Sequence, residues 1–402
     1  MNTDALIAAL QTHNQDRDPQ LLRMKYRKMA QGAFLFLRGA DHLFYDELLP
    51  DQPLFRKAPL AWSCGDLHVE NFGSYKGDNR QVYFDINDFD EAALAPASWD
   101  LVRLLTSIQC GAEALRVSAN EAAALSARCL DAYRAALANG KPRWVERETS
   151  VGLIRDLLCD LQDRKRVDFL DKRTTRKGPR RSLNLDGVKA LPLLPGQREL
   201  LDAFLPGFAA QQEQPGFYTM LDAARRIAGT GSLGLMRFVV LVEGKGSPDG
   251  NYLLDIKECK PSALAPRLAA WKIAQPAWPD QASRVVTAQH HMQAVDHAFL
   301  HAVALDGRSC VLRGLQPSED RVALDAWGKK LVRLEEVIAT MGCNLAWDQL
   351  RGAGRGGAAG ADELIAHGRD DGWRQPMLNA AAAMAEQTQA QWRACKEWLA
   401  NA

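Results

Sequence analysis

Two short acid-rich stretches in the first quarter of the chain constrain its fold most strongly. The first, CGDLHVENFG, spans residues 64–73, and the second, YFDINDFDEA, spans residues 83–92. Carboxylates held close together repel one another, and burying them costs on the order of several kcal/mol unless a cation or hydrogen bonds compensate. The fold must therefore either leave these acids on a solvent-exposed hairpin, paired with nearby lysines, or gather them around a cation.

The residue types in the two stretches favour a cation, because an oxygen-only ligand set that includes an amide is typical of Mg²⁺. Mg²⁺ usually keeps several waters and takes one or two protein carboxylates plus substrate phosphates. Asn71 and Asp88 suit such a partial site, with Asp90 as the substitute for Asp88. Asp66 would then be free to accept a proton from an attacking hydroxyl, which is the division of labour that phosphoryl transfer requires.

The composition narrows the class of protein. The 402 residues suffice for two or three lobes, and 47% hydrophobic and 25% charged residues are ordinary for a globular chain. The net charge of +1 and the lack of a long apolar run indicate neither a nucleic-acid nor a membrane partner, and they leave the oligomeric state open. The eight scattered cysteines and the absence of a signal-peptide pattern predict a cytoplasmic protein with reduced thiols.

The hydrophobic pattern divides the chain into helical and strand-like regions. It predicts helices over residues 20–50, 99–138, 150–163, 281–298, 319–342 and 376–400. It predicts strands over 235–244 and 251–260 and hairpins over 71–88 and 299–315, the second with Asp306-Gly307 as its turn. We therefore expect four parts: a first part with the acid-rich hairpin over 1–150, a helical and basic connecting segment over 151–225, a β-rich lobe over 226–318, and closing helices over 319–402.

Residues 65–71, GDLHVEN, resemble the catalytic loop G-D-x-H-x-x-N of aminoglycoside and choline-type phosphotransferases. Asp88 and Asp100, twelve residues apart, resemble the acids of the metal-binding segment of those enzymes. The resemblance implies a protein-kinase-like two-lobe fold that uses ATP and Mg²⁺. It also implies these roles: Asp66 as the catalytic base, His68 as the histidine of the loop, Asn71 and Asp88 as Mg²⁺ ligands, and Asp100 as the acid that braces the loop.

The glycine-rich loop and the lysine that precede the catalytic loop in such enzymes occur downstream in this chain. GTGSLG, residues 229–234, is followed by a strand-like stretch, and the next strand carries Lys257. The expected nucleotide contacts are Gly229, Gly231, Ser232, Gly234 and Lys257, with Arg313 and Leu315 in a hinge over residues 313–317 that faces adenine. We therefore expect a circularly permuted kinase-like α+β fold, with a mostly helical large lobe and a small antiparallel β lobe.

One charged partner that kinases use is missing. The predicted helix over 281–298 would be the counterpart of the helix whose glutamate pairs with the lysine, but it contains no glutamate. Gln289 or Gln293 could hydrogen-bond Lys257 without balancing its charge. Glu258 is adjacent in sequence, but alternation along a strand places it on the opposite face from Lys257. The missing acid is compatible with an altered activity.

The arrangement of the whole chain also resembles a bacterial family called domain of unknown function 2252. The motifs that carry this resemblance are FLRGA at residues 36–40, GDLHVENFG, NDFDEA, GTGSLG, IKE and RVVTAQHHMQ. They cover most of the chain, from about residue 24 to the predicted hinge. The family brings no established substrate, so the resemblance bears on the fold.

We expect the chain to transfer the γ-phosphate of ATP to a hydroxyl of a small molecule, because it leaves little room for the long activation segment of a protein kinase. The basic segment 164–184 is either a solvated loop or a clamp for an anionic acceptor, through Lys172, Arg173, Arg176, Arg180 and Arg181. The alternatives are nucleotidyl transfer to protein (AMPylation), a pseudokinase that binds nucleotide without catalysis, and a helical protein whose motifs are accidental.

Overall fold

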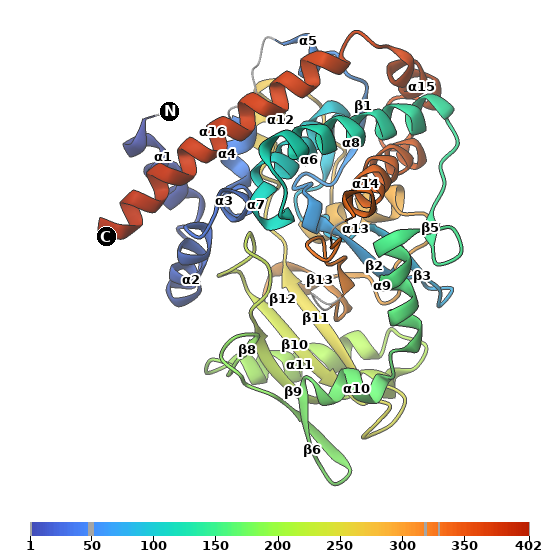
Figure 1. Cartoon of the computed structure of the whole chain (residues 1–402). Helices are drawn as coiled ribbons and strands as arrows, with labels where there is room; N and C mark the ends of the chain where they lie inside the picture. Colours follow the sequence, from blue (N-terminus) through green and yellow to red (C-terminus); the bar gives the residue numbers. More distant parts are fainter. Residues whose placement is uncertain (1, 47–51, 317–319, 329, 402) are drawn as a thin grey trace.

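The computed structural model describes residues 2–46, 52–316, 320–328 and 330–401. It is a mixed α+β protein with a mainly helical part and a six-stranded antiparallel sheet (Figure 1). Both ends of the chain contribute to the helical part, and the sheet comes from the middle of the sequence. Residues 47–50 of the first predicted helical region, Pro317 of the predicted hinge and Glu319 at the start of a predicted helix lie outside the described residues.

The N-terminal elements hold the acid-rich stretches. Helices α1 (Thr3–His13), α2 (Pro19–Met29), α3 (Ala33–Gly39), α4 (Asp41–Asp46) and α5 (Pro53–Arg56) precede strand β1 (Leu60–Ser63). The short helix η1 (Val69–Asn71) then leads into β2 (Phe72–Lys76) and β3 (Val82–Ile86), which form the predicted hairpin. Strand β4 (Ala93–Pro96) pairs with β1 in a register that sets Ser63 opposite Ala93. This pairing brings the residues that follow β1 close to those that precede β4.

Helices from both ends of the chain form the main hydrophobic core. They are α6 (Ser98–Cys110), α7 (Ala112–Leu115), α8 (Ala119–Asn139), α9 (Gly152–Asp163), α14 (Leu331–Gly352), α15 (Ala361–Arg369) and α16 (Arg374–Asn401). Helix α8 starts at a capping box between Ser118 and Glu121 and ends at Gly140, whose φ of 69° suits a C-terminal cap. Helix α6 is almost wholly buried because α8 and α16 pack against it. None of the described helices combines the length and the apolar character that crossing a bilayer would require.

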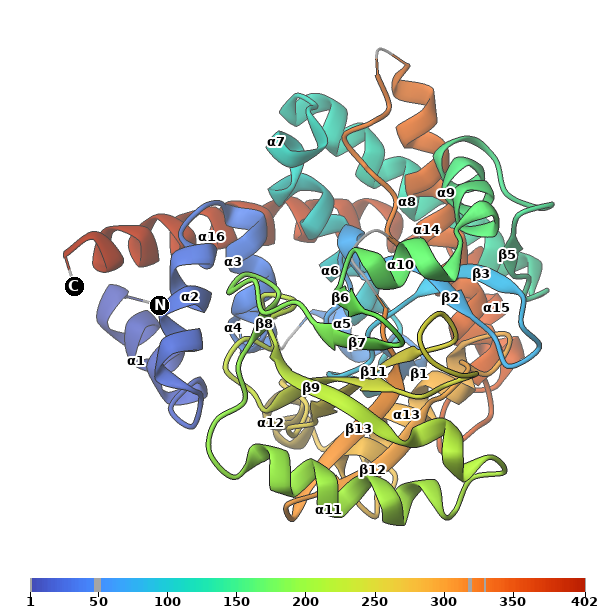
Figure 2. The same cartoon turned by 90° about the horizontal axis from the view of Figure 1, so that it is seen from below.

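The sheet has the order β12–β13–β11–β10–β9–β8, with every neighbouring pair antiparallel. Its strands are β8 (Ala190–Leu191), β9 (Met220–Arg226), β10 (Arg237–Val242), β11 (Tyr252–Glu258), β12 (His301–Leu305) and β13 (Arg308–Gly314). Helix α11 (Gln197–Ala209) covers one face, where Leu205 and Phe208 join a core with Val240 and Ile256 (Figure 2). Because side chains alternate along a strand, the neighbours of these core residues in β10 and β11 turn to the opposite face.

The helix that precedes the second hairpin is shorter than predicted. The sequence predicts a helix to residue 298, but α13 (Gln281–Met292) ends at Met292, and Gln293 is extended. The residues after Gln293 are bound to the tip of the β2–β3 hairpin. The N–H of Asp78 donates to the carbonyl of Asp296, at 2.8 Å, and Gly77 forms a β-bridge with His297. A long-range contact thus overrides the local helical pattern, because its hydrogen bonds are available only in the folded chain.

The remaining predicted elements are largely confirmed. Strands β10 and β11 fall within the two predicted stretches, and β12 and β13 are joined at Asp306 and Gly307, which both have positive φ. Helix α14 begins and ends later than its predicted range, and short helices such as η2 (Pro215–Tyr218), α12 (Ala265–Ala270) and α15 are additions. Strands β8 and β9 precede residue 226, where the sequence predicts the start of the β-rich lobe.

The basic segment 164–184 forms helix α10 (Arg166–Asp171) and a hairpin of β6 (Thr174–Lys177) and β7 (Arg180–Leu183), with β5 (Val145–Glu146) further upstream on the edge of β3. Arg181 is buried and pairs with Asp171 at 2.5 Å and with Asp249 at 3.0 Å. Arg176 pairs with the same Asp249 at 3.2 Å. The segment is therefore folded and fastened to the β10–β11 turn through Asp249, while residues 175–180 of its hairpin are exposed, so the solvated and the clamp interpretations both stay predictions.

Candidate functional site

Two cavities adjoin one another between the helical part and the sheet. The first, here called the acid cavity, has a volume of about 280 Å³, and the second, called the basic cavity, has a volume of about 500 Å³. Asn71, Asp88, Gly229 and Ser232 line both cavities. Of the other predicted site residues, the acid cavity is lined by Asp66, His68, Asp90, Gly231 and Lys257, and the basic cavity by Arg313 and Leu315. Residues of the two acid-rich stretches therefore line the same two cavities as residues of the predicted β-rich lobe.

The backbone around Asp66 is fixed by hydrogen bonds and by a glycine. The N–H groups of Cys64 and Gly65 donate to the carboxylate of Asp100, at 2.8 and 3.1 Å. Gly65 has a φ of 86°, and a Cβ there would lie 2.2 Å from the carbonyl oxygen of Glu91. Only glycine fits this position without displacing the chain that carries the second acid-rich stretch. Asp100 therefore braces the loop, as the phosphotransferase resemblance implies.

The carboxylate of Asp66 lies in a buried, mixed electrostatic environment. Burial raises its pKa to about 6, against the opposing charge of Arg103, which donates from Nε to Asp66 Oδ1 at 3.0 Å. His68 Nε2 lies 3.9 Å from Asp66 Oδ2. Burial, followed by the nearby Arg38 and Arg103, holds the pKa of His68 well below its usual range, so its ring is neutral. Asp66 is therefore the group in this pair that changes protonation near neutral pH.

Asn71 and Asp88 present oxygen atoms that suit a hard cation. The Nδ2 atom of Asn71 donates to the carbonyls of Asp66 at 3.2 Å and of Asp88 at 3.1 Å. With the amide nitrogen committed to these carbonyls, Oδ1 is the atom left to act as a ligand. Burial opposes ionisation of Asp88, but Lys257, Arg313 and Arg237 outweigh it and lower the pKa. The Asp88 side chain is 46% exposed, so these residues fit an oxygen-ligated Mg²⁺ that keeps several waters.

Lys257 bridges the sheet to the second acid-rich stretch. Its Nζ forms an ion pair with Asp90 and lies 3.3 Å from Asp88 Oδ2, although Lys257 and Asp88 are 169 residues apart in sequence. Gln289 donates to Gln293, which in turn donates to the carbonyl of Ile86, so the expectation that one of them serves Lys257 is not met. Asp90 therefore supplies a carboxylate that pairs with Lys257, and Asp88 is the more exposed of the two acids.

Glu258 lines the acid cavity beside Lys257, although alternation along the strand predicts the opposite face, and its carboxylate has partners of its own. Its carboxylate lies 3.2 Å from the guanidinium of Arg308 and accepts the N–H of Met236 at 3.1 Å. The two adjacent charges of β11 therefore serve different neighbours, and the Lys257 ammonium is directed to the acid-rich stretch.

Cationic side chains of α2 and of the segment between α1 and α2 hold the glycine loop between β9 and β10. Arg17 donates to the carbonyls of Gly231 and, at 2.7 Å, of Leu233. Lys25 donates to the carbonyl of Gly231 at 3.1 Å, and Lys28 to that of Gly229 at 3.3 Å. Because N–H and C=O of one trans peptide point in opposite directions, the N–H groups that follow these carbonyls point away from the three cations. Thr230 and Ser232, which carry two of these N–H groups, line the acid cavity, and backbone N–H groups in such a loop suit an anion.

Gly234, the last predicted loop residue, is a position that only glycine suits. Its φ is 92°, and a Cβ there would lie 2.7 Å from Cβ of Arg17. The carbonyl of Gly234 accepts the N–H of Asp18 at 3.0 Å. Gly234 is not among the residues that line the two cavities, so it fastens the loop to the segment between α1 and α2.

The basic cavity is lined by more cations than its carboxylates can balance. Arg226 and Arg237 each lie 2.6 Å from Asp255, which is fully buried, and Arg313 lies 3.8 Å from it. Burial lowers the pKa of Arg226 to about 10, against the opposing effect of Asp255. Arg38 and Arg321 share Glu70 in the same way. Five arginines thus share two carboxylates, which makes this cavity attractive to an anionic ligand.

At the predicted hinge, the backbone N–H of Leu315 is already engaged, and Leu315 lines the basic cavity. The N–H of Leu315 donates to the carbonyl of Leu253 at 2.8 Å, and the carbonyl of Gln316 accepts from Arg226 at 2.8 Å. Leu315 and Leu253 line the basic cavity together with Val239. These three side chains provide an apolar wall beside the arginines.

Comparison with known proteins decides the family of the chain. The sequence profile of an uncharacterized protein family conserved in bacteria, DUF2252, matches residues 17–397. The chain belongs to the DUF2252 family. No curated protein and no solved structure matches it.

Several site residues of this DUF2252 chain escaped the sequence reasoning. Lys25 follows Leu21 and precedes Met29 by four residues each, so it occupies a buried stripe of α2. Arg103 occurs in the same way within the apolar run of α6. A cation on an otherwise apolar helical face was the available signal, because such a residue must have a buried partner. Arg17 and Arg38 carried no comparable signal.

Proposed function

We propose that this DUF2252 chain is a kinase-like phosphotransferase that uses ATP and Mg²⁺ to phosphorylate a hydroxyl of a small molecule. The observation that carries the proposal is the meeting of two motifs distant in sequence: Asp66, Asn71 and Asp88 line a cavity together with the glycine loop and Lys257. A candidate base, oxygen ligands for a metal, a glycine-rich loop and a lysine are the parts that phosphoryl transfer requires.

The order of elements in the middle of the chain supports the kinase-like part of the proposal. Strand β9, the glycine loop, β10, the Lys257 strand β11, helix α13 and the hairpin of β12 and β13 follow one another along the chain. This is the order that the kinase resemblance requires of a small lobe. The catalytic-loop elements precede it in sequence, which is what the proposed circular permutation entails.

Each residue has a distinct task in the proposed reaction. Asp66 takes the proton from the acceptor hydroxyl, whose oxygen forms a bond to the γ-phosphorus while the bond to the β,γ-bridging oxygen breaks and ADP leaves. Asn71 and Asp88 hold Mg²⁺, which when bound neutralises charge on the phosphates. Lys257, oriented by Asp90, contacts the phosphates beneath the glycine loop, and the arginines of the basic cavity attract the nucleotide.

A second candidate is nucleotidyl transfer to a protein hydroxyl. Asp255 and its arginines lie on the sheet face beside the basic cavity, and the N–H of Leu315 is already engaged. Both features favour a nucleotide orientation different from that of typical kinases. In that reaction the α-phosphorus is attacked and diphosphate leaves. Mass spectrometry of protein incubated with ATP separates the two activities, because an adenylyl group and a phosphoryl group differ in mass.

Thermal unfolding with ATP alone, Mg²⁺ alone and both together tests the proposed site. Ligand at 100 times its dissociation constant stabilises the native state by about 2.7 kcal/mol, which raises the unfolding midpoint by several degrees. We expect a shift that requires both ligands and is lost in Asp88→Ala. Asp78→Ala, which removes an exposed acid from the tip of the β2–β3 hairpin, is the matched control and should respond as wild type. The absence of any shift at millimolar ATP in wild type would contradict the proposal.

A further inference from the structure

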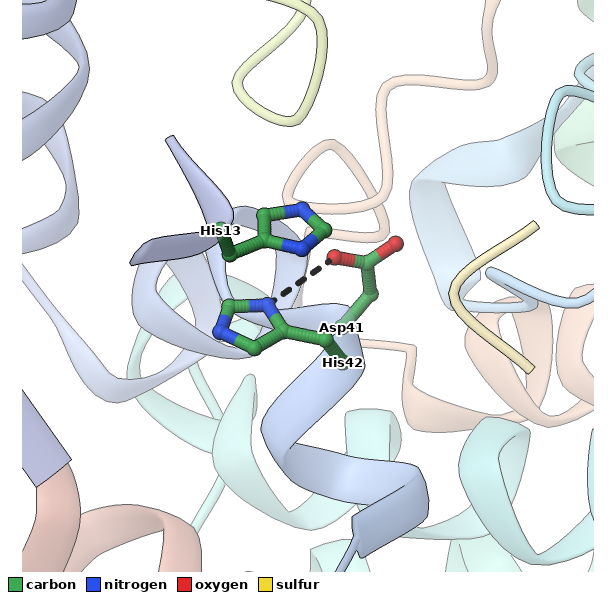
Figure 3. A group of neighbouring side chains, drawn as sticks. All are labelled: His13, Asp41 and His42. Carbon is green, nitrogen blue, oxygen red and sulfur yellow. Dashed lines mark ion pairs between the residues drawn. The ribbon is translucent and has the colours of Figure 1, made fainter. Parts of the chain in front are cut away.

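A second cluster of potential metal ligands lies at the edge of the acid cavity. His13 ends α1, and Asp41 and His42 begin α4 (Figure 3). One ligand atom from each residue can be chosen so that all three lie within 4.8 Å of one another. His42 Nδ1 is 3.7 Å from Asp41 Oδ1, and the two imidazole rings are stacked with their centroids 3.8 Å apart. None of these residues belongs to the Asn71 and Asp88 site.

The imidazole ring of His42 in this cluster has no hydrogen bond to the described part of the protein. Both ring nitrogens of His42 are buried without a hydrogen-bond partner among the described residues. The Asp41 carboxylate is also buried, and its described ion pair is the 3.7 Å contact with His42. A buried imidazole without hydrogen bonds is costly, so it normally has a partner such as a metal ion. Two independent observations, the convergence of the three side chains and the unpartnered ring of His42, therefore point to one ligand.

We propose that His13, Asp41 and His42 bind a transition-metal ion of the Zn²⁺ or Mn²⁺ type. Two imidazoles and one carboxylate are the ligand set that such ions favour, whereas Mg²⁺ prefers oxygen ligands alone. At metal–ligand bonds of about 2.1 Å, ligand atoms lie roughly 3.4 Å apart in a tetrahedral shell. The lone pairs of stacked rings lie in parallel planes, so one ring must turn on binding. His13 is exposed and can turn, while Asp41 and His42 are held in the interior.

The position of the cluster gives the ion access to substrate. His13 and Asp41 line the acid cavity together with Asp66, while His42 lies behind them. Three protein ligands leave at least one coordination position open, and open positions are a feature of catalytic rather than structural metal sites. The ion would therefore face the cavity and take water or an oxygen of the small molecule as its remaining ligand. The site also ties α1 to α4, which carry its ligands.

Titration of tag-free protein with Co²⁺ and with Zn²⁺ tests the site. Co²⁺ reports coordination by imidazole and carboxylate through its visible absorption, and calorimetry with Zn²⁺ gives the stoichiometry. We expect one ion per chain, and an affinity at least ten-fold lower in His13→Ala and Asp41→Asn. His290→Ala is the matched control, because it removes a histidine that contacts only a surface acid, Asp296, within the described hydrogen bonds. It should bind the ion as wild type does.

Two outcomes would overturn the proposal: no stoichiometric binding of either ion by wild type, or unchanged binding by both His13→Ala and Asp41→Asn. His13→Ala alters an exposed side chain, and circular dichroism at the start of each titration shows whether a variant is folded. Asp88→Ala separates this site from the proposed function: it should lose the response to Mg²⁺ and ATP and keep Co²⁺ binding. A protein that ignores ATP but binds one Co²⁺ would support this site alone.

Discussion

At the scale of single residues, the protonation of Asp66 gives a direct test of its role as base. Burial raises its pKa to about 6, so the carboxyl is neutral below that pH and ionised above it. Only the ionised form accepts a proton, and the rate of ADP formation from ATP, with a small-molecule hydroxyl or water as acceptor, should therefore rise with pH through about 6 and level off above. Asp66→Asn should lower that rate by roughly 10²–10⁴-fold while MgATP still shifts the unfolding midpoint. The measurement is a pH–rate profile of both proteins.

A rate that falls as the pH rises through 6, or an Asp66→Asn variant as active as wild type, would exclude Asp66 as the base. Asp78→Asn, an exposed substitution outside both cavities, controls for the general effect of removing an acid. If Asp66→Asn and wild type both bind MgATP but neither forms ADP with any small-molecule hydroxyl supplied, the pseudokinase alternative is favoured.

The residues that sequence reasoning found are those whose spacing carries chemistry. Asp66, Asn71 and Asp88 stood out because their separation matches a known division of labour, and the structure brings them to one cavity. The partners that tune them were not visible in the same way. Arg103 reaches Asp66 from α6, and Asp90 reaches Lys257 from the turn before β4, through contacts that only the folded chain defines. The spacing of residues in the sequence predicts the candidate site residues, whereas the tertiary packing determines which side chains hold them in place.

At the scale of elements, the glycine loop owes its conformation to the N-terminal helices. Arg17 donates to two of its carbonyls and so orients the peptide groups that would face the phosphates. Arg17→Ala should therefore weaken MgATP binding several-fold, measured by calorimetry, with the fold retained. Arg23→Ala, which removes an exposed arginine from α2, should leave the affinity unchanged. Equal affinities for wild type and Arg17→Ala would show that the loop binds nucleotide without this support.

The elements that could be predicted are those with a strong local pattern. The β12–β13 hairpin has a turn that only residues tolerant of positive φ can form, and its strands alternate regularly. Strand β9, MLDAARR, lacks the β-branched residues typical of strands, and it exists because β10 pairs with it and α11 packs over it. Helix α11 itself contains Pro206, which weakened its helical signal. Tertiary contacts thus determine what local propensity leaves undecided.

At the scale of the whole molecule, the two parts are joined by charged and polar contacts near the site. Arg284 of α13 donates to the carbonyls of Ala92 and Asp90, at 2.5 and 2.7 Å, beside the ion pair of Lys257 with Asp90. The second acid-rich stretch therefore forms part of the interface between the helical part and the sheet. Because this interface contains the proposed ligand-binding groups, nucleotide binding and the relative position of the two parts should be coupled.

The same architecture predicts that the chain still folds when its termini are joined and new termini are made before the β-rich lobe, which gives the order of elements of an ordinary kinase. Helices α1 and α16 share a hydrophobic cluster that includes Leu10 and Cys395, and the termini lie on one side of the molecule (Figures 1 and 2). Joining residues 401 and 2 through a Gly/Ser linker of about 12 residues and opening the exposed turn between Pro195 and Gly196 should give a folded protein, since termini in such positions permit permutation. We expect a cooperative unfolding transition and a retained MgATP shift.

A second permutant with the same linker, opened between Gly231 and Ser232, should fold but lose the shift, because the cut divides the glycine loop. Loss of folding in the first permutant would contradict the inferred arrangement, whereas an equal MgATP shift in both would exclude the glycine loop from nucleotide binding.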